Sequence, residues 1–185
     1  MSRAPGQVRI IGGRWRGTRL PVADAPGLRP TPDRTRETLF NWLAPVLPGA
    51  RVLDLFAGSG ALGFEALSRG AHEALLVERD PRLCEALRGV AQRLQGGEAA
   101  NIVQADAVAF LDAPLHGRFD VVFLDPPVAD ELWERVLERL DAWTADQAWL
   151  YLESPLQRSI EAPGWRPHRE GRSRETRHAL YRRES

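Results

Sequence analysis

The chain has 185 residues, of which 43% are hydrophobic, and its 25 basic side chains balance its 25 acidic ones. This length predicts one compact unit with a core of ordinary size, and no apolar run approaches the ~20 residues that span a bilayer, so we expect no membrane partner. Cys84 is the only cysteine, which excludes a disulfide within one chain and favours a cytoplasmic location.

Arginine supplies every basic side chain, and the arginines gather toward the two ends of the chain. Residues 1–36 carry eight arginines against two acids, and residues 158–185 carry eight against four. Two basic ends around an acidic middle suit a protein whose terminal segments bind phosphates while its centre performs chemistry. The base content of the genome is an alternative source of this composition, but it does not explain the clustering.

The N-terminal segment predicts a β-hairpin with strands over residues 8–11 and 18–21 and with Arg14-Trp15-Arg16 in its turn. An exposed ring between two guanidinium groups could clamp RNA. Burial of Trp15 at the edge of the core is at least as good an interpretation. We therefore predict a basic hairpin extension over residues 1–30.

A helix is predicted next, because Pro30-Thr31-Pro32-Asp33 precedes the apolar positions Leu39, Phe40 and Leu43. Thr31 or Asp33 is the expected N-cap of this helix. The N-terminal amides of the helix could then face an anion.

Residues 51–56 form a short apolar run that predicts a buried strand, and glycines turn the chain from it into a helix. Gly58 and Gly60 belong to a G-x-G-x-x-G match, and Glu78 ends the next strand 24 residues after Asp54. An acid near this offset binds the ribose of a nucleotide cofactor. The motif fits a nicotinamide dinucleotide as readily as S-adenosylmethionine, and glycines here are also ordinary turn formers.

The third and fourth predicted strands are also followed by acids. Residues 101–104 precede Asp106-Ala107, and residues 119–124 precede Asp125-Pro126-Pro127. Two prolines cannot continue a ladder of hydrogen bonds, so the fourth run predicts a central parallel strand that stops at Asp125. Ligands of open α/β sheets bind beyond such carboxyl ends. A carboxylate and two rigid carbonyls at this place suit an amino group that is being alkylated.

The last third of the chain predicts a helix over residues 132–140, a strand over residues 149–152 and an antiparallel strand pair over residues 165–168 and 176–181. The linking residues 169–175 predict an exposed, mobile turn. The four histidines are scattered without ligand spacing, so we expect no metal site.

Taken together, these acids and glycines resemble the pattern of class I S-adenosylmethionine-dependent methyltransferases. The resemblance sharpens in residues 8–17 and 28–43, which are far longer than a chance motif and closely resemble the bacterial 16S ribosomal RNA guanine-N2 methyltransferase family. It continues through residues 54–63, 65–69 and 151–153 and so covers most of the chain up to residue 154.

The resemblance implies S-adenosylmethionine as the cofactor and a role for each matching residue. Gly58 and Gly60 would flank its methionine part, and Asp54 would belong to the same site. Glu78 would accept hydrogen bonds from the ribose hydroxyls, as a paired acceptor can. Asp106-Ala107 would hold the adenine edge through a carboxylate and a backbone amide.

The reaction and the substrate are implied as well. Asp125, Pro126 and Pro127 would form the catalytic motif, in which the Asp125 carboxylate and the Pro126 carbonyl accept the two hydrogens of guanine N2. The base would be extruded from its stack for in-line attack on the methyl group. The expected partner is 16S ribosomal RNA in the assembled or assembling small subunit. The residues expected to contact this RNA are Arg14, Trp15, Arg16 and Val128.

The fold that the resemblance implies is α/β, with a doubly wound, Rossmann-like, mostly parallel sheet of seven strands and an antiparallel C-terminal strand. The N-terminal hairpin is a small extension of this unit. Residues 31–185 would form one compact methyltransferase domain.

Val128 departs from the family pattern, which normally places an aromatic residue after Asp-Pro-Pro to stack on the target base. Stacking is worth about 1–3 kcal/mol per base, so either another ring supplies the platform or base capture is weaker. Three alternatives stay open. They are a non-catalytic S-adenosylmethionine- and RNA-binding ribosome-assembly factor, an N-methyltransferase for another nucleic acid or a protein amide, and a nicotinamide-dependent oxidoreductase.

Overall fold

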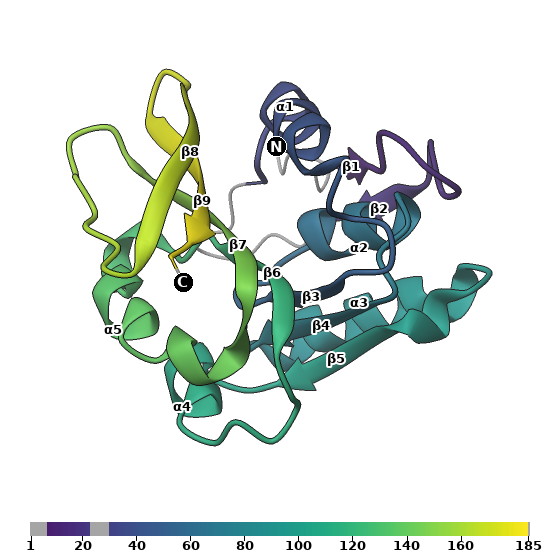
Figure 1. Ribbon diagram of the computed structural model, residues 1–185. Coiled ribbons are helices and arrows are strands. Elements are labelled where there is room, and N and C mark those ends of the chain that lie inside the picture. The colour runs from purple at the N-terminus through teal and green to yellow at the C-terminus, as the bar shows by residue number, and fades with distance from the viewer. Residues whose placement is uncertain (1–6, 23–29, 185) are drawn as a thin grey trace.

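The computed structural model describes residues 7–22 and 30–184, and a sheet of seven strands lies at its centre (Figure 1). In chain order the strands are β3 (Arg51–Asp54), β4 (Glu73–Glu78), β5 (Ala100–Gln104), β6 (Phe119–Leu124), β7 (Thr144–Pro155), β8 (Trp165–Arg172) and β9 (Thr176–Arg183). Their order across the sheet is β5-β4-β3-β6-β7-β9-β8. Strands β3 to β7 run parallel, whereas β9 runs antiparallel to both β7 and β8. The predicted Rossmann-like α/β fold is confirmed.

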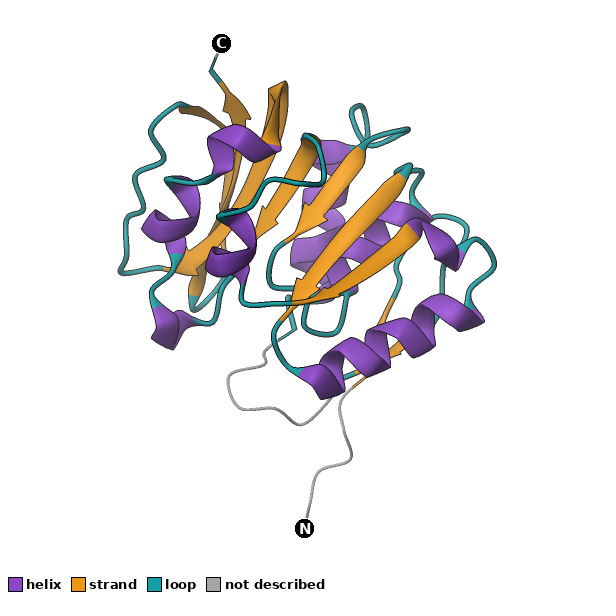
Figure 2. Ribbon diagram, turned by 90° about the horizontal axis from the view of Figure 1, so that it is seen from below, coloured by secondary structure: helices purple, strands orange, loops and turns teal. Residues whose placement is uncertain are grey.

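Helices cover both faces of this sheet (Figure 2). Those of the described chain are α1 (Asp33–Leu43), α2 (Ala61–Ser68), α3 (Pro81–Arg93), α4 (Ala107–Leu111) and α5 (Trp133–Leu137), with short 3₁₀ helices η1 (Gly97–Ala99), η2 (Val128–Asp130) and η3 (Leu140–Trp143). Buried residues of α1, α2 and α3 belong to one apolar core, and those of α4, α5 and η3 belong to a second. Within the described ranges, no helix is long and apolar enough to cross a membrane.

The central strands carry apolar runs because they separate these two cores. In β6, Val121 and Phe123 contribute to the first core, whereas Val122 and Leu124 contribute to the second. Successive side chains of a strand point to opposite faces, so a strand between two cores requires a continuous apolar run. Asp125 follows this run directly and therefore stands at the carboxyl edge of the sheet.

The strand order reverses between β3 and β6. The chain runs outward from β3 through β4 to β5 and then returns to form β6 on the other side of β3. In doubly wound sheets, the crevice at such a reversal is where ligands bind. Asp54, the last residue of β3, and Asp125, which follows β6, flank this place.

The N-terminal hairpin has the predicted strands, β1 (Gln7–Arg9) and β2 (Arg19–Pro21), which pair antiparallel with Val8 opposite Leu20. Both of these side chains are buried in the first core. The division of the chain into an extension and a domain stays a prediction. Its boundary at residue 30 adjoins residues 23–29, which lie outside the described residues.

Two local predictions are wrong. Helix α1 has Pro32 at its N-cap position and no side-chain cap, so neither Thr31 nor Asp33 serves as one. Residues 169–172 belong to β8, so the predicted mobile turn shrinks to residues 173–175. The outermost strand of a sheet often carries charged side chains, which prevent edge-to-edge association and hide the apolar alternation of a strand.

Candidate active site

Five acids line the carboxyl edge of the parallel strands. Each ends or closely follows its strand, so the strand order fixes their sequence along the edge. From β5 across to β7 they are Asp106, Glu78, Asp54, Asp125 and Glu153. The acids predicted to bind a cofactor therefore occupy one half of the edge, and the Asp-Pro-Pro motif follows them at the strand reversal.

Glycines shape the turn between β3 and α2. Gly58 and Gly60 have φ values of 55° and 80°, a conformation that favours glycine. A Cβ atom at Gly60 would lie 2.6 Å from the ring of Phe64. The Gly58 N–H donates to Glu78 Oε2 at 3.0 Å. The turn thus presents backbone without side chains beside one of the edge acids.

Glu78 and Asp106 offer the acceptors that a nucleoside needs. Both Glu78 oxygens accept a backbone N–H, one of them from Asp80 at 3.1 Å. Because a carboxylate oxygen has two lone pairs, each can still accept from a ribose hydroxyl. Asp106 caps α4 by accepting the Ala109 N–H at 3.0 Å, and Ala107 begins this helix, where amides have no intrahelical partner. The residues present therefore fit a nucleoside cofactor.

Asp54 lies beneath the glycine turn with 3% of its surface exposed. Its Oδ2 accepts the Gly63 N–H at 3.1 Å. Burial raises the pKa of Asp54 from 3.8 to about 7 against the effect of this hydrogen bond, and the charge of Glu78 adds to the rise. Asp54 therefore fastens the turn to the sheet and becomes fully charged only above neutral pH.

Asp125 meets a second acid through a shared hydroxyl. Thr31 Oγ1 lies 3.3 Å from Asp125 Oδ2 and 3.3 Å from Glu153 Oε2. The Tyr151 hydroxyl donates to the same Glu153 oxygen at 2.8 Å. Burial raises the pKa of Asp125 well above its usual range, and the charges of Glu153 and Asp54 raise it further, whereas the Thr31 hydrogen bond lowers it. Raised carboxyl pKa values of this origin are typical of functional sites.

The two prolines after Asp125 use their carbonyls differently. The Pro127 carbonyl accepts the Asp130 N–H at 3.2 Å and so begins η2. The Pro126 carbonyl accepts no hydrogen bond from the described residues. One carboxylate and one carbonyl without a hydrogen-bond partner among the described residues therefore stand next to each other in the chain at the strand reversal.

Val128 is 60% exposed at the start of η2. Phe123 is fully buried and packs edge-on against Phe40 and Tyr151. Trp133 is 1% exposed, and its Nε1 donates to the Glu153 carbonyl at 2.8 Å. Neither ring is available as a platform for a base in place of Val128.

Trp15 is buried, with 6% of its surface exposed. Its Nε1 donates to the Gln95 carbonyl at 2.9 Å, and its ring packs against Phe64 with the centroids 6.4 Å apart. The guanidinium of Arg14 covers the ring at 4.3 Å. Of the two interpretations of Trp15, burial at the edge of the core is therefore the correct one, and its ring does not stack on RNA in this conformation.

The turn that carries Trp15 also lies far from the strand reversal. The Arg14 N–H donates to the Ser68 carbonyl at 2.9 Å. Ser68 ends α2, and this helix starts at the carboxyl edge of the sheet and returns toward its amino edge. The structure does not bring Arg14 and Arg16 next to Asp125, and a contact of these arginines with RNA stays a prediction.

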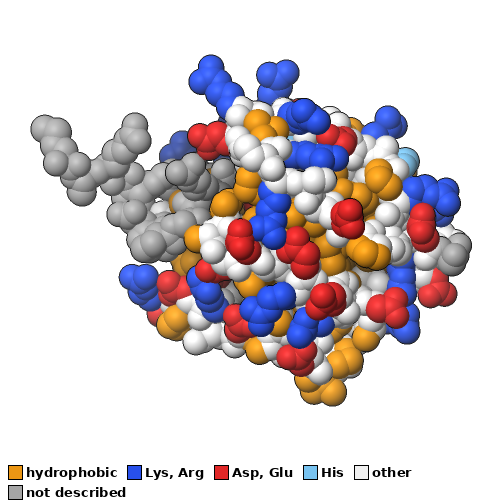
Figure 3. All heavy atoms as spheres, turned by 90° about the vertical axis from the view of Figure 1, so that its left-hand side faces the viewer, with side chains coloured by type: hydrophobic (Ala, Val, Ile, Leu, Met, Phe, Trp, Pro, Cys, Tyr) orange, Lys and Arg blue, Asp and Glu red, His pale blue; other side chains and the backbone are white. Residues whose placement is uncertain are grey.

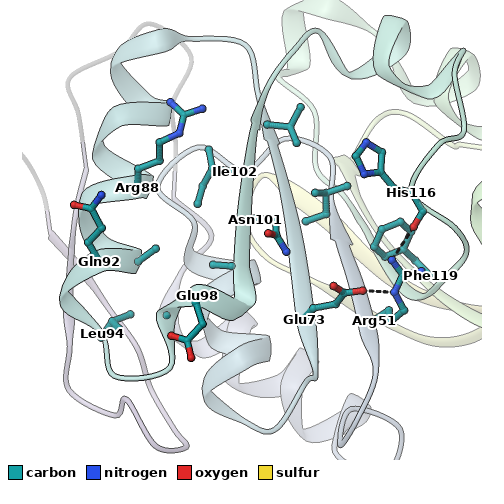
Figure 4. Close-up of a pocket in the computed structure, with 15 residues that line it drawn as sticks. Arg51, Glu73, Arg88, Gln92, Leu94, Glu98, Asn101, Ile102, His116 and Phe119 are labelled. Atoms are coloured by element: carbon teal, nitrogen blue, oxygen red, sulfur yellow. Dashed lines mark hydrogen bonds and ion pairs between the residues drawn. The ribbon is translucent and has the colours of Figure 1, made fainter.

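A cavity of about 750 Å³ opens at the amino edge of the sheet, beside α3 and β5 (Figure 4). Arg51, Glu73 and Phe119 line it from the first residues of their strands. Arg51 is paired with Glu73 and donates to the carbonyls of Arg118 and His116 at 2.7 Å each. None of the predicted site residues lines this cavity, so it is separate from the candidate active site.

Comparison with known proteins places the chain in a family. The family model described as Conserved hypothetical protein 95 matches residues 8–182. Ribosomal RNA small subunit methyltransferase D of Escherichia coli strain K12 is 47% identical over 184 residues, which cover 97% of this chain and 92% of that protein. The chain belongs to the ribosomal RNA small subunit methyltransferase D family. The protein of the same name from Haemophilus influenzae is 43% identical over 86% of this chain and 85% of its own length.

Solved structures of similar sequence have the same fold. A structure named methyltransferase yhhF from Escherichia coli has a TM-score of 0.86 and 47% identity over 97% of this chain and 99% of its own. Methylase HI0767 from Haemophilus influenzae has a TM-score of 0.82 and 36% identity over 97% and 100% of the two chains. An RNA methyltransferase from Salinibacter ruber, solved with S-adenosyl-L-homocysteine, shares the fold at a TM-score of 0.62 and 19% identity.

Sequence reasoning found Asp125 but missed the partners of its carboxyl group. Glu153 ends the apolar run of β7 as Asp125 ends that of β6, and this parallel was the available signal. Thr31 gave no signal of its own, because a threonine between two prolines also suits a helix cap. Its hydrogen bonds to residues 94 and 122 positions away depend on the folded chain.

Proposed function

We propose that this protein transfers a methyl group from S-adenosylmethionine to the exocyclic N2 of a guanine in the 16S ribosomal RNA of the small subunit. The name of its relatives supports a ribosomal RNA substrate. The observation that carries the proposal is the position of Asp125 and the Pro126 carbonyl at the strand reversal, next to the acids that suit a nucleoside cofactor.

The bound cofactor supplies an electrophilic methyl group on a sulfonium. In this proposal Gly58 and Gly60 leave the backbone open to its methionine part, with Asp54 holding their turn in place. Glu78 accepts from the ribose hydroxyls, and Asp106-Ala107 binds the adenine edge. This arrangement directs the methyl group toward the reversal between β3 and β6.

Asp125 and Pro126 then prepare the amino group of the guanine. The lone pair of N2 is conjugated into the ring, which makes this nitrogen a poor nucleophile. When Asp125 and the Pro126 carbonyl accept its two hydrogens, the lone pair is directed toward the methyl carbon, and the negative charge stabilises the positive charge that develops on nitrogen. Because N2 is paired inside a helix, the base must be extruded first.

A basic turn stands at the same edge of the sheet. In the pairing of β7 with β9, Thr176 lies opposite Pro155, so the β8–β9 turn lies beside the carboxyl ends of the parallel strands. Arg172 and Arg174 are exposed at this turn, and Figure 3 shows arginine side chains that project from the top of this side of the molecule. Exposed guanidinium groups bind RNA phosphates, and this turn would contact the RNA around the extruded base.

The exposed Val128 favours one alternative function, a non-catalytic RNA-binding factor for ribosome assembly. An aliphatic side chain gives apolar contact but no π face, which forgoes about 1–3 kcal/mol of stacking. A base can still be held by the hydrogen bonds of Asp125 and Pro126. We therefore propose catalysis, and a methylation assay distinguishes it from the non-catalytic function.

The test is methylation of small ribosomal subunits from cells that lack this enzyme, with labelled S-adenosylmethionine and mapping of the labelled nucleotide. Wild-type protein should label N2 of one guanine. Asp125→Ala should lower the rate by about 10²- to 10⁴-fold, because it removes both the orienting acceptor and the stabilising charge. Asp146→Asn is the matched control, since Asp146 is exposed on β7 and should keep the wild-type rate.

Each outcome separates the alternatives. Label on an adenine, a protein or another RNA would assign a different substrate. No label on subunits or naked RNA, with S-adenosylmethionine still bound, would favour the non-catalytic factor. Wild-type turnover by Asp125→Ala would refute the assignment of Asp125.

A further inference from the structure

The hydrogen bonds around Thr31 require one more proton than the usual charges supply. Thr31 Oγ1 lies at hydrogen-bond distance from one oxygen of Asp125 and one of Glu153. A hydroxyl has one hydrogen to donate and two lone pairs to accept with. If both acids were ionised, one carboxylate oxygen would face a lone pair of the hydroxyl at 3.3 Å with no hydrogen between them.

No cation among the described residues relieves this repulsion. Neither acid forms an ion pair with any residue of the described ranges, and their carboxyl oxygens contact the hydroxyl groups of Thr31 and Tyr151. The groups that face the two acids are Asp54 on β3, Thr31 before α1, Tyr151 on β7 and His178 on β9.

His178 does not supply a charge to the cluster. It stands opposite Glu153 in the pairing of β7 with β9 and is 5% exposed. Its Nδ1 is buried without a hydrogen-bond partner among the described residues. Burial lowers the pKa of His178, although the charges of Glu153 and Glu170 oppose this, so the ring is neutral at physiological pH.

We propose that Asp125 and Glu153 hold one proton between them through the Thr31 hydroxyl, and that Glu153 is a positioning residue for methyl transfer. One carboxyl group of the pair then donates to Thr31 Oγ1, and the Thr31 hydroxyl donates to the other. Every hydrogen bond in the chain from Tyr151 to Asp125 is satisfied in this way. Two close carboxyl groups that share one proton titrate as a pair.

The inference rests on the proposed function and adds the fate of the proton. When N2 attacks the methyl carbon, the N–C bond forms, the C–S bond breaks and sulfur takes the electron pair. The nitrogen then carries one hydrogen too many and releases it as a proton. A pair that holds one proton has one negative charge and one free site, so it accepts this proton and becomes neutral.

The first measurement is the carboxylic-acid C=O band in the infrared spectrum, which does not depend on activity. Asp54→Asn is the background, because Asp54 titrates near neutral pH and would add its own band. At about pH 8, above the ordinary carboxyl range, this background should keep a protonated-acid band. Adding Glu153→Gln should move the band to lower pH, because the charge of Glu153 no longer raises the pKa of Asp125, whereas burial still does.

The second measurement is the rate of methylation. Glu153→Gln should lower kcat by about 10²-fold, the low end for proton transfer, while the affinity for S-adenosylmethionine stays unchanged. Thr31→Val keeps the shape of residue 31 and removes the hydroxyl, so it should lower kcat similarly. It should shift the band to higher pH, because the Thr31 hydrogen bond lowers the pKa of Asp125. Circular dichroism and thermal unfolding establish that each variant is folded.

The outcomes distinguish this inference from the proposed function. A band whose pH dependence is unchanged in Glu153→Gln, or a wild-type kcat in that variant, would overturn the shared proton. A protein that labels no RNA would overturn the proposed function, and the infrared band would still decide whether the pair holds a proton.

Discussion

Two clusters of carboxyl groups in this protein differ in how their charge is compensated. Glu65, in the middle of α2, is fully buried and accepts the N–H groups of Ile11 and Gly12 at 2.8 and 3.0 Å. Arg69 donates to it at 2.8 Å, and Arg36 lies 3.7 Å away. Asp125 and Glu153, in contrast, have hydroxyl groups as partners and no guanidinium among the described residues.

Under the proposed function, this difference separates a structural acid from a reactive one. A buried charge is tolerated when opposite charges and hydrogen bonds compensate it, and Glu65 is compensated on every side. An acid that must accept hydrogens from a substrate cannot be neutralised in this way, because a guanidinium would occupy its lone pairs. Uncompensated carboxyl groups, of which Glu153 is buried and Asp125 half-buried, therefore mark the edge at which we place the chemistry.

Arg36 is the residue that makes the Glu65 cluster structural. Its side chain is fully buried, and its guanidinium also donates to the Arg9 carbonyl at 3.0 Å and to Asp33 at 2.5 Å. Through these contacts it ties the hairpin and α1 to α2. Its Nε donates to the Thr31 carbonyl at 3.3 Å, so the same arginine holds the residue that bridges Asp125 and Glu153.

The largest effect on the free energy of unfolding is expected when Glu65 loses the compensating charge of Arg36. Arg36→Met keeps much of the side-chain volume but leaves Glu65 with one guanidinium, and it should lower the free energy of unfolding by about 3–5 kcal/mol. Urea unfolding measures this directly. The double variant Arg36→Met/Glu65→Gln should recover part of the loss, and a single variant as stable as wild type would contradict the structural role of the cluster.

A smaller effect, an increase in the free energy of unfolding, is expected when Asp54 at the carboxyl edge loses its charge. The pKa of Asp54 rises from 3.8 to about 7 on folding, so between these pH values the folded state binds more protons than the unfolded state. The free energy of unfolding therefore falls as pH rises through this window. Asp54→Asn keeps an acceptor for the Gly63 N–H and removes the charge.

This variant should match wild type near pH 4 and exceed its stability by about 1–4 kcal/mol above pH 7. Denaturant unfolding at a series of pH values gives the two curves. Other groups whose pKa values shift on folding, Asp125 and His178 among them, contribute to the slope that remains in the variant. Parallel curves for the two proteins would mean that Asp54 is charged throughout the window.

The sequence could predict the sheet and the position of Asp125 because both depend on local patterns. Continuous apolar runs predict strands between two cores, and prolines fix where β6 ends. The contacts of Trp15 could not be predicted, since its Nε1 bonds to a carbonyl 80 residues away. The burial of Glu65 could have been predicted, because it is the one charged residue in a helix whose other seven residues are apolar or small.

The smallest effect is expected where the Glu65 cluster meets the hairpin turn. Ser68 Oγ accepts the Trp15 N–H at 2.9 Å and donates to the Gly12 carbonyl at 2.6 Å. Ser68→Ala leaves a buried N–H without a partner and should cost about 1–2 kcal/mol of unfolding free energy. Ser159→Ala, at an exposed position, is the control and should change stability by less than about 0.5 kcal/mol. Because Ser68 lies at the far end of α2 from Asp125, Ser68→Ala should leave the rate of methylation unchanged, and a fall in rate without a fall in stability would show that the hairpin turn acts on the substrate.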